Sequence, residues 1–209
     1  IVFIGPEEGD MACGEWGLGR MSEPDQIAAA VEDFFRQGLP LSGKRALVTS
    51  GPTHEAIDPV RYLANRSSGK QGHAIAGALA RLGSQTPLVS GPSHQPDPPG
   101  VEVVKIETAI QMLEACEQAL PVDVAVLAAA VSDWRAEMVT TRKIKKTANK
   151  KPPELTLVEN PDILATLSAK GNLRPRLVVG FAAETDDVIA NATKKRTAKG
   201  CDWIVANDV

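Results

Sequence analysis

From Arg45 onward, short apolar runs alternate with stretches of helical spacing, and this alternation constrains the fold more than any other feature. Continuous runs of this kind are typical of strands that are buried on both faces. Helical patterns lie between several of them, over residues 69–83, 108–120, 160–171 and 185–200. We therefore predict an α/β fold, with a doubly wound, mostly parallel, Rossmann-like sheet and helices on both faces. The runs, rich in valine and leucine, are ALVTSG, TPLVSGP, VEVVK, DVAVLAAA, ELTLVE, RLVVGFA and DWIVAND.

The first 42 residues do not follow this alternation, so we expect them to form a separate piece. IVFIGPEEG at the start predicts a strand that runs into a Pro/Gly turn, and residues 22–37 predict one helix. GLPLSGKR, at residues 38–45, is rich in turn formers and places a boundary between residues 42 and 43. The chain starts without methionine, and its last apolar run leaves no room for a covering helix. We interpret it as a fragment that is cut at both ends.

Charge and hydropathy exclude several classes of protein. The net charge of −3 argues against a general nucleic-acid binder, although residues 142–151 (RKIKKTANKK) hold six basic side chains and no acid. No stretch approaches the roughly 18 apolar residues of a membrane span, and the N-terminus lacks the pattern of a secretion signal. We expect a cytoplasmic protein that binds neither nucleic acid nor membrane.

The segment after the first apolar run is the first candidate site, because open parallel sheets bind ligands beyond the carboxyl ends of their strands. Residues 51–68 form a loop of 18 residues, which is long for a compact domain. It ends in SSGKQG (67–72), whose backbone N–H groups at a helix N-terminus would suit a phosphate. Gln71 stands where a Walker A motif needs Ser or Thr, and Pro52-Thr53 stands where a dinucleotide fingerprint needs glycine.

Two later strand ends carry further candidates. Asp133 follows the fourth run, and Lys143 begins a basic loop ten residues later. A carboxylate for Mg²⁺ or a sugar hydroxyl, with lysines in reach of a triphosphate, is what nucleotide chemistry requires. A solvated lysine loop is the alternative for such a basic run. Phe181, after RLVVG, could flank a base or belong to the core, and the lysines of residues 194–199 could bind phosphate or compensate a helix dipole.

The three cysteines divide into two kinds. Cys116 and Cys201 lie in apolar surroundings and are predicted to be buried. Cys13 lies in a Gly-rich loop, where an exposed thiol could act as an acid or a nucleophile. Their wide spacing fits neither a disulfide framework nor a zinc motif.

Six motifs in fixed order over about residues 43–209 together resemble the phosphopantothenate-cysteine ligase family. They are SGPTHEAIDPVRYLANRSSGKQG, AAAVSDWR, RKIKK, ENPDI, GFAAET and ANDV. Upstream, ACGEWGLGRM resembles the C-terminal flap of phosphopantothenoylcysteine decarboxylase, a flavin enzyme that is fused ahead of the ligase in bacterial coenzyme A biosynthesis. The resemblance implies that residues 1–42 are the C-terminal piece of the decarboxylase with a linker. Residues 43–209 would be a CTP-dependent ligase domain that is truncated at its C-terminus.

The resemblance also implies an activity. The ligase joins 4'-phosphopantothenate to L-cysteine through an acyl-cytidylate, with CTP converted to CMP and pyrophosphate in the presence of Mg²⁺. The other half of the bifunctional protein then decarboxylates phosphopantothenoylcysteine to 4'-phosphopantetheine, and its FMN is expected only in the missing upstream portion. A homodimer through the ligase domain is implied, with a higher oligomer through the decarboxylase domain.

The resemblance assigns catalytic roles to four residues. Lys143 would contact the triphosphate and support formation of the acyl-cytidylate. Asn65 would hold the acyl carbonyl of this intermediate, and Arg61 would assist its conversion. Cys13 would be the proton donor of the decarboxylase.

The remaining implied residues bind the nucleotide. Asp133 would contact the nucleotide or its Mg²⁺, and Lys195 and Lys199 would engage phosphates. The other residues implied to contact the nucleotide are Ala129, Asn160, Pro161, Asp162, Ile163 and Phe181, of which the last five bracket the cytidine.

Two other functions stay open at this point. An NAD(P)-dependent reductase shares the predicted sheet but lacks its fingerprint here. A non-catalytic nucleotide-binding fragment is compatible with a truncated chain.

Overall fold

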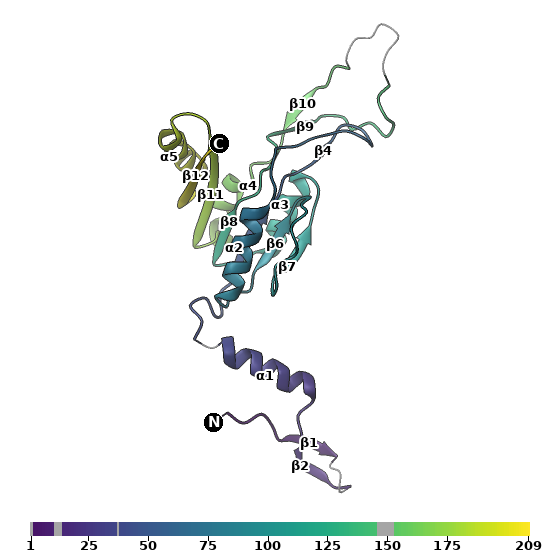
Figure 1. Ribbon diagram of the computed structural model, residues 1–209, viewed down its shortest axis with the longest axis vertical. Coiled ribbons are helices and arrows are strands. Elements are labelled where there is room, and N and C mark those ends of the chain that lie inside the picture. Colours follow the sequence, from purple (N-terminus) through teal and green to yellow (C-terminus); the bar gives the residue numbers. More distant parts are fainter. Residues whose placement is uncertain (1, 11–13, 37, 146–152) are drawn as a thin grey trace. The chain divides into compact units, whose positions relative to one another are not determined.

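The computed structural model describes residues 2–10, 14–36, 38–145 and 153–209, and it divides the chain into two units, Ile1–Ser42 and Gly43–Val209 (Figure 1). In the first unit, β1 (Glu7–Asp10) pairs with β2 (Trp16–Arg20) in an antiparallel ribbon, and α1 (Pro24–Arg36) follows. The helix was predicted. The strand predicted for the opening residues is wrong in position, because β1 begins after Pro6, whose nitrogen has no hydrogen to donate to a ladder.

A six-stranded parallel sheet forms the centre of the second unit, with the order β12-β11-β8-β3-β6-β7. This confirms the predicted fold class. The order reverses between β3 and β8, which is the topological switch point of a doubly wound sheet. The strands are β3 (Ala46–Ser50), β6 (Pro87–Ser90), β7 (Glu102–Lys105), β8 (Val124–Leu127), β11 (Leu177–Glu184) and β12 (Trp203–Asp208).

Helices cover both faces of this sheet, and neighbouring residues of one strand point into different cores. Leu47 of β3 packs in a cluster with side chains of α3 and α4, whereas Val48 packs in a second cluster with α2. This alternation follows from the two-residue period of a strand. The helices are α2 (Lys70–Arg81), α3 (Ala109–Ala119), α4 (Ile163–Ser168) and α5 (Val188–Lys199), with a short 3₁₀ helix over Gly171–Leu173.

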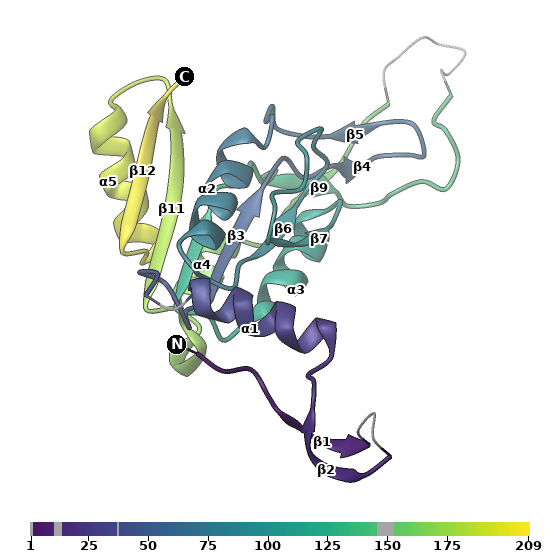
Figure 2. The same ribbon diagram turned by 60° about the horizontal axis from the view of Figure 1, so that its bottom comes forward.

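One predicted strand lies outside the central sheet. The run ELTLVE forms β10 (Leu157–Glu159), which pairs in an antiparallel ribbon with β9 (Trp134–Ala136). Leu157 is 44% exposed, so the alternation within this run fits a half-exposed ribbon better than a strand buried on both faces. A second small ribbon, β4 (Glu55–Ala56) with β5 (Tyr62–Leu63), belongs to the long loop after β3. Figures 1 and 2 show β4 and β9 beyond the end of the sheet.

Burial on both faces was also predicted for VEVVK and for the last strand, and this is wrong for both. VEVVK forms the edge strand β7, whose residues are mostly exposed. β12 is an edge strand, and Trp203 on it is 62% exposed. The central strand β3, by contrast, is buried throughout. None of the described helices is long and apolar enough to cross a membrane.

Candidate functional site

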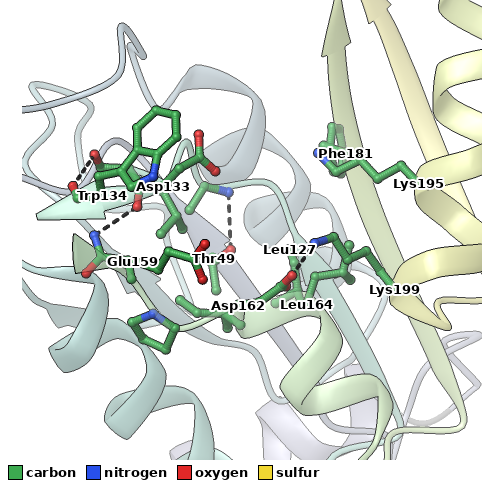
Figure 3. A pocket seen from close by; sticks show the side chains of 16 residues that line it. Thr49, Leu127, Asp133, Trp134, Glu159, Asp162, Leu164, Phe181, Lys195 and Lys199 are labelled. Carbon is green, nitrogen blue, oxygen red and sulfur yellow. Dashed lines mark hydrogen bonds and ion pairs between the residues drawn. The ribbon is translucent and has the colours of Figure 1, made fainter. Parts of the chain in front are cut away.

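A cavity of about 450 Å³ opens at the carboxyl ends of β3, β8 and β11, where the strand order reverses (Figure 3). This is the position at which doubly wound sheets bind ligands. Figure 3 shows Asp133, Trp134 and Glu159 on one side and Phe181, Lys195 and Lys199 on the other. The lining residues are Thr49, Leu127, Ala129, Val131, Ser132, Asp133, Trp134, Glu159, Asn160, Pro161, Asp162, Ile163, Leu164, Phe181, Lys195 and Lys199.

The wall of the cavity is the extended segment 129–133, which follows β8. Beyond the end of β8 its backbone needs new hydrogen-bond partners, because buried N–H and C=O groups are rarely left unpaired. Two threonines that are themselves buried provide some of them. The N–H of Ala129 donates to Thr49 Oγ1 (3.2 Å), and the N–H of Ser132 donates to Thr53 Oγ1 (3.0 Å).

Two asparagine amides hold the carbonyl groups of the same wall. Asn65 Nδ2 donates to the carbonyl oxygen of Val131 (2.9 Å), and Asn160 Nδ2 donates to that of Ser132 (2.9 Å). The N–H of Asn160 also donates to the carbonyl oxygen of Asp133 (2.8 Å). The wall is therefore fixed by segments that lie far apart in the sequence.

The floor of the cavity is the start of α4. The sequence predicts Asn160 as the cap of this helix, but this is wrong: Asp162 is its N-cap residue, with a side chain that accepts from the N–H of Ala165 (2.9 Å). Asn160 uses its amide for the wall instead. Leu164 lies against Gly180 of β11, where a Cβ would meet Leu164 Cδ2 at 2.6 Å. A Cβ at position 180 would therefore require the side chain of Leu164 to shift.

Two lysines of α5 provide positive charge at the cavity. Lys199 forms an ion pair with Asp162 across the cavity floor, and Lys195 lies one turn away on the same helix (Figure 3). Burial raises the pKa of the Asp162 carboxyl, but the N–H of Ala165 and the two lysines outweigh this effect, so its pKa is lowered. Asp162 is therefore a stable anion that holds Lys199 in place.

The structure brings together most of the predicted nucleotide-binding residues. Of the ten, Lys143 is the exception, because it does not line the cavity. Asp133 is an exposed residue at the rim and Phe181 is half-buried. The nine residues that line the cavity are Ala129, Asp133, Asn160, Pro161, Asp162, Ile163, Phe181, Lys195 and Lys199.

The predicted catalytic residues lie in different places. Asn65 contacts the cavity wall, as described. Arg61 lies in the long loop, where its guanidinium pairs with the buried Asp58 and reaches the backbone beside Lys143. Lys143 itself is exposed. Cys13 lies outside the described residues.

Several residues of the site were missed by sequence reasoning. Thr49 and Glu159 line the cavity, and Asp58 joins Arg61 to the segment of Lys143. Thr49 had a signal in the sequence, since it is a polar residue near the carboxyl end of an otherwise apolar run. Asp58 is one of many acidic side chains in loops, and its burial could not be foreseen.

The phosphate cradle predicted at residues 67–72 does not line the cavity. The N–H of Gly69 donates to Ser67 Oγ (3.3 Å) and the N–H of Lys70 donates to Ser68 Oγ (3.4 Å), so local serine side chains already accept from two of its donors. The cysteine predictions are confirmed for the described pair. Cys116 and Cys201 are buried and free, and burial raises both thiol pKa values, that of Cys116 to about 12.

The side chains that line the cavity limit which cations could bind there. Among the described residues, no group of three or more His, Cys, Asp or Glu side chains could hold a metal ion. Mg²⁺ commonly uses only one or two protein carboxylates and takes its other ligands from phosphates and water. Asp133 at the rim fits that limited role.

Comparison with known proteins places the chain in a family. Residues 41–209 match the family described as the DNA/pantothenate metabolism flavoprotein C-terminal domain. The chain belongs to this family. Over 206 residues it is 47% identical to the coenzyme A biosynthesis bifunctional protein CoaBC of Vibrio parahaemolyticus, covering 98% of the chain and 51% of that protein. The chain thus spans about half the length of the curated relatives that it matches.

Two solved structures share the fold of this family member. The crystal structure of the C-terminal domain of a CoaBC protein has a TM-score of 0.70 and 43% identity, covering 82% of this chain and 80% of that one. A Cab2 variant in complex with phosphopantothenate-cysteine has a TM-score of 0.64 and 18% identity, covering 90% of this chain and 81% of that one. At this level of identity the second match supports the fold alone.

Proposed function

We propose that residues 43–209 form the active site of a ligase that joins 4'-phosphopantothenate to L-cysteine at the expense of CTP. One observation carries the proposal: nine of the ten residues that the resemblance implies for nucleotide binding line a single cavity at the switch point of the sheet. Membership of a pantothenate-metabolism family and 47% identity to a coenzyme A biosynthesis protein support it.

The chemistry explains why such a cavity combines cations with amide donors. A carboxylate is a poor electrophile, because its negative charge repels an amine and its oxygen is a poor leaving group. Attack of the carboxylate oxygen on the α-phosphate of CTP would release pyrophosphate and give an acyl-cytidylate, from which CMP leaves readily when the cysteine amine attacks. Lysines and N–H donors near the phosphates would stabilise the charge that develops during both steps.

We assign the two sides of the cavity to different parts of CTP. Phe181 and the segment 160–163 would bracket the cytidine, and the backbone of Ala129 would contact the nucleotide. Lys195 and Lys199 on α5 would contact the phosphates, with the Lys199 ion pair to Asp162 keeping one ammonium group at the cavity floor.

Asp133 is the residue that we propose to hold Mg²⁺. When bound, the cation would neutralise phosphate charge and orient the triphosphate. The single carboxylate at the rim suits a metal ion that arrives with the nucleotide and takes most of its ligands from phosphate and water.

Lys143, Asn65 and Arg61 remain our proposed catalytic residues. Because Lys143 does not line the cavity of its own chain, we propose a homodimer in which it extends over the site of the partner subunit. Asn65 contacts the wall through one amide hydrogen, and its carbonyl and second hydrogen could serve the acyl group. Arg61 would assist conversion of the intermediate.

The first unit, Ile1–Ser42, is proposed to be the end of the flavin-dependent decarboxylase together with a linker. Cys13 would be its proton donor, and FMN would bind to the decarboxylase half of the full protein. The full bifunctional protein would form a higher oligomer through that domain and act in the cytoplasm. The linked reaction would decarboxylate phosphopantothenoylcysteine to 4'-phosphopantetheine.

Pyrophosphate release tests the ligase proposal. We expect release that requires CTP, Mg²⁺ and 4'-phosphopantothenate together, and product formation only after L-cysteine is added. Release that does not depend on phosphopantothenate would contradict a ligase, and reduction of NAD(P)⁺ by a substrate would favour the alternative enzyme class.

A pair of lysine variants tests the assignment of the cavity. Lys199→Gln should raise the KM for CTP, because it removes a cation from the proposed phosphate side. Lys194→Gln is the matched control, since this neighbouring lysine on α5 is exposed and does not line the cavity. Equal KM values in the two variants would show that the phosphates bind elsewhere.

A further inference from the structure

We propose that Asp58 is a positioning residue for the ligase reaction, and that it acts by fixing the backbone beside Lys143 together with the side chain of Arg61. This inference rests on the proposed function for its catalytic part. Its structural part, a clamp between two loop segments, stands on the geometry alone.

The carboxylate of Asp58 is surrounded by donors. Its Oδ1 accepts from the N–H groups of Val60 and Arg61, both at 2.9 Å. Its Oδ2 accepts from Arg61 Nε (3.0 Å) and from the N–H of Ile144 (3.1 Å), and Arg61 Nη2 lies 2.7 Å from the same oxygen. One carboxylate therefore joins its own turn to a segment more than 80 residues away.

The segment of Lys143 is held at several points. Arg61 Nη2 donates to the carbonyl oxygen of Ile144 (2.6 Å), so both backbone groups of Ile144 are engaged by the Asp58–Arg61 pair. Nearby, the N–H of Thr140 donates to the carbonyl oxygen of Ile57 (3.1 Å). Lys143 lies between these two attachment points, so its backbone is fixed while its side chain extends into solvent.

The charge of Asp58 is required for this arrangement. The residue is 3% exposed, and burial alone would raise the pKa of its carboxyl. The N–H groups of Ile144, Val60 and Arg61 and the Arg61 guanidinium outweigh burial and lower the pKa to about 2. The carboxylate is therefore ionised at neutral pH, where it faces donors on every side.

Burial also distinguishes Asp58 from the catalytic residues. A side chain that is 3% exposed and fully engaged with protein donors is not available to substrate, whereas Lys143 and Arg61 are exposed. Substitution of Asp58 should therefore change catalysis only through these two residues. The cavity that would bind the nucleotide is lined by other residues and should keep its affinity.

Amide hydrogen exchange tests the clamp without any assay of activity. Asp58→Asn in the full chain keeps the size of the side chain but places an amide where a charged acceptor is needed. We expect exchange at Ile144 to accelerate by about tenfold, measured by mass spectrometry on peptides that cover residues 138–145. Asp123→Asn is the matched control, because Asp123 also accepts from a backbone N–H (Arg45) and a basic side chain (Lys44) but has no contact with these segments. Unchanged exchange at Ile144 would refute the clamp.

Kinetics test the positioning role. For Asp58→Asn we expect kcat for pyrophosphate release to fall by about 10- to 100-fold, with the KM for CTP nearly unchanged. In a double-mutant cycle, Asp58→Asn should lower kcat much less in the Lys143→Gln background than in the wild type, because it acts mainly through Lys143. Fully additive effects, or an unchanged kcat despite faster exchange at Ile144, would overturn the proposal. If the wild-type chain releases no pyrophosphate with CTP and phosphopantothenate, the proposed function itself fails, and hydrogen exchange still decides whether the clamp exists.

Discussion

Gly91 occupies the closest backbone contact around the candidate site, and its replacement by alanine should disrupt the cavity wall. A Cβ at this position would lie 1.7 Å from the carbonyl oxygen of Pro52 and 2.8 Å from its carbonyl carbon. A normal contact would require the 51–53 turn to move by about 1.5 Å, since non-bonded carbon and oxygen atoms pack at roughly 3.2 Å or more. No rotation of a side chain can relieve this clash, because both atoms belong to the backbone.

The expected loss of stability can be estimated from the hydrogen bonds of that turn. Three hydrogen bonds join it to the segment after β8: Ala130 N–H to Gly51 O (2.9 Å), Thr53 N–H to Ala130 O (3.4 Å) and Ser132 N–H to Thr53 Oγ1 (3.0 Å). At about 1 kcal/mol each, their loss lowers the free energy of unfolding by about 3 kcal/mol. For a domain of this size the Tm should fall by about 6–12 °C.

Thermal unfolding followed by circular dichroism measures this effect. Gly77→Ala is the matched control, because a Cβ at Gly77 would meet no atom closer than 3.3 Å and alanine favours the helix in which it lies. We expect the control to stay within about 1 kcal/mol of the wild type. If Gly91→Ala unfolds within 2 °C of the control, the turn does not support the wall in the way that we describe.

Three further predictions concern single side chains. Lys143→Gln should nearly abolish formation of the acyl-cytidylate, whereas Asn65→Asp should let it form but convert it poorly; wild-type turnover in both variants, measured by product analysis, would refute the catalytic assignment. The pKa of Asp58 is lowered from 3.8 to about 2, so its contribution to stability is present above about pH 4 and is lost as the pH falls toward 2. Asp58→Asn should remove that part of the acid dependence, and acid-unfolding curves that keep the wild-type slope would contradict it. Cys116, with its pKa raised to about 12, should resist alkylation at pH 8 in the native protein and react after denaturation, as judged by mass spectrometry; rapid native labelling would show that its burial is wrong.

The central sheet could be predicted from the sequence because its inner strands β3, β6 and β8 bury both faces. Runs such as ALVTSG leave no polar face, so a parallel strand between two helical layers is the only common solution. The same rule failed for ELTLVE, which has the composition of a buried strand but lies in a half-exposed ribbon. Whether such a run is buried depends on the strand with which it pairs. The partner here, β9, is 21 residues or more away in the chain, so the local sequence does not reveal it.

The cavity could be predicted in outline because strand ends converge at a switch point. Asp133 follows β8, whereas Phe181 was predicted to follow a strand but lies within β11, and the topology places both at one edge of the sheet. The contacts that fix the wall could not be predicted in this way. They depend on which side chain finds a free backbone group after folding, as with the amide of Asn160, which would have served equally well as a helix cap.

Asp58 marks the limit of sequence reasoning at this site. In the sequence it is an acidic residue before a proline, a pattern typical of exposed turns. Its burial follows from the return of residues 140–144 over the turn, which is a long-range event that no local pattern encodes.

The wall at residues 129–133 depends on four side chains, of which Thr49, Thr53 and Asn65 come from the beginning of the domain and Asn160 from its later part. A partially folded intermediate that lacks any of these segments would have no rudimentary version of the site. Occupancy should therefore protect the entire domain from proteolysis as one cooperative unit, since a ligand binds to such a wall only when these distant segments are folded together.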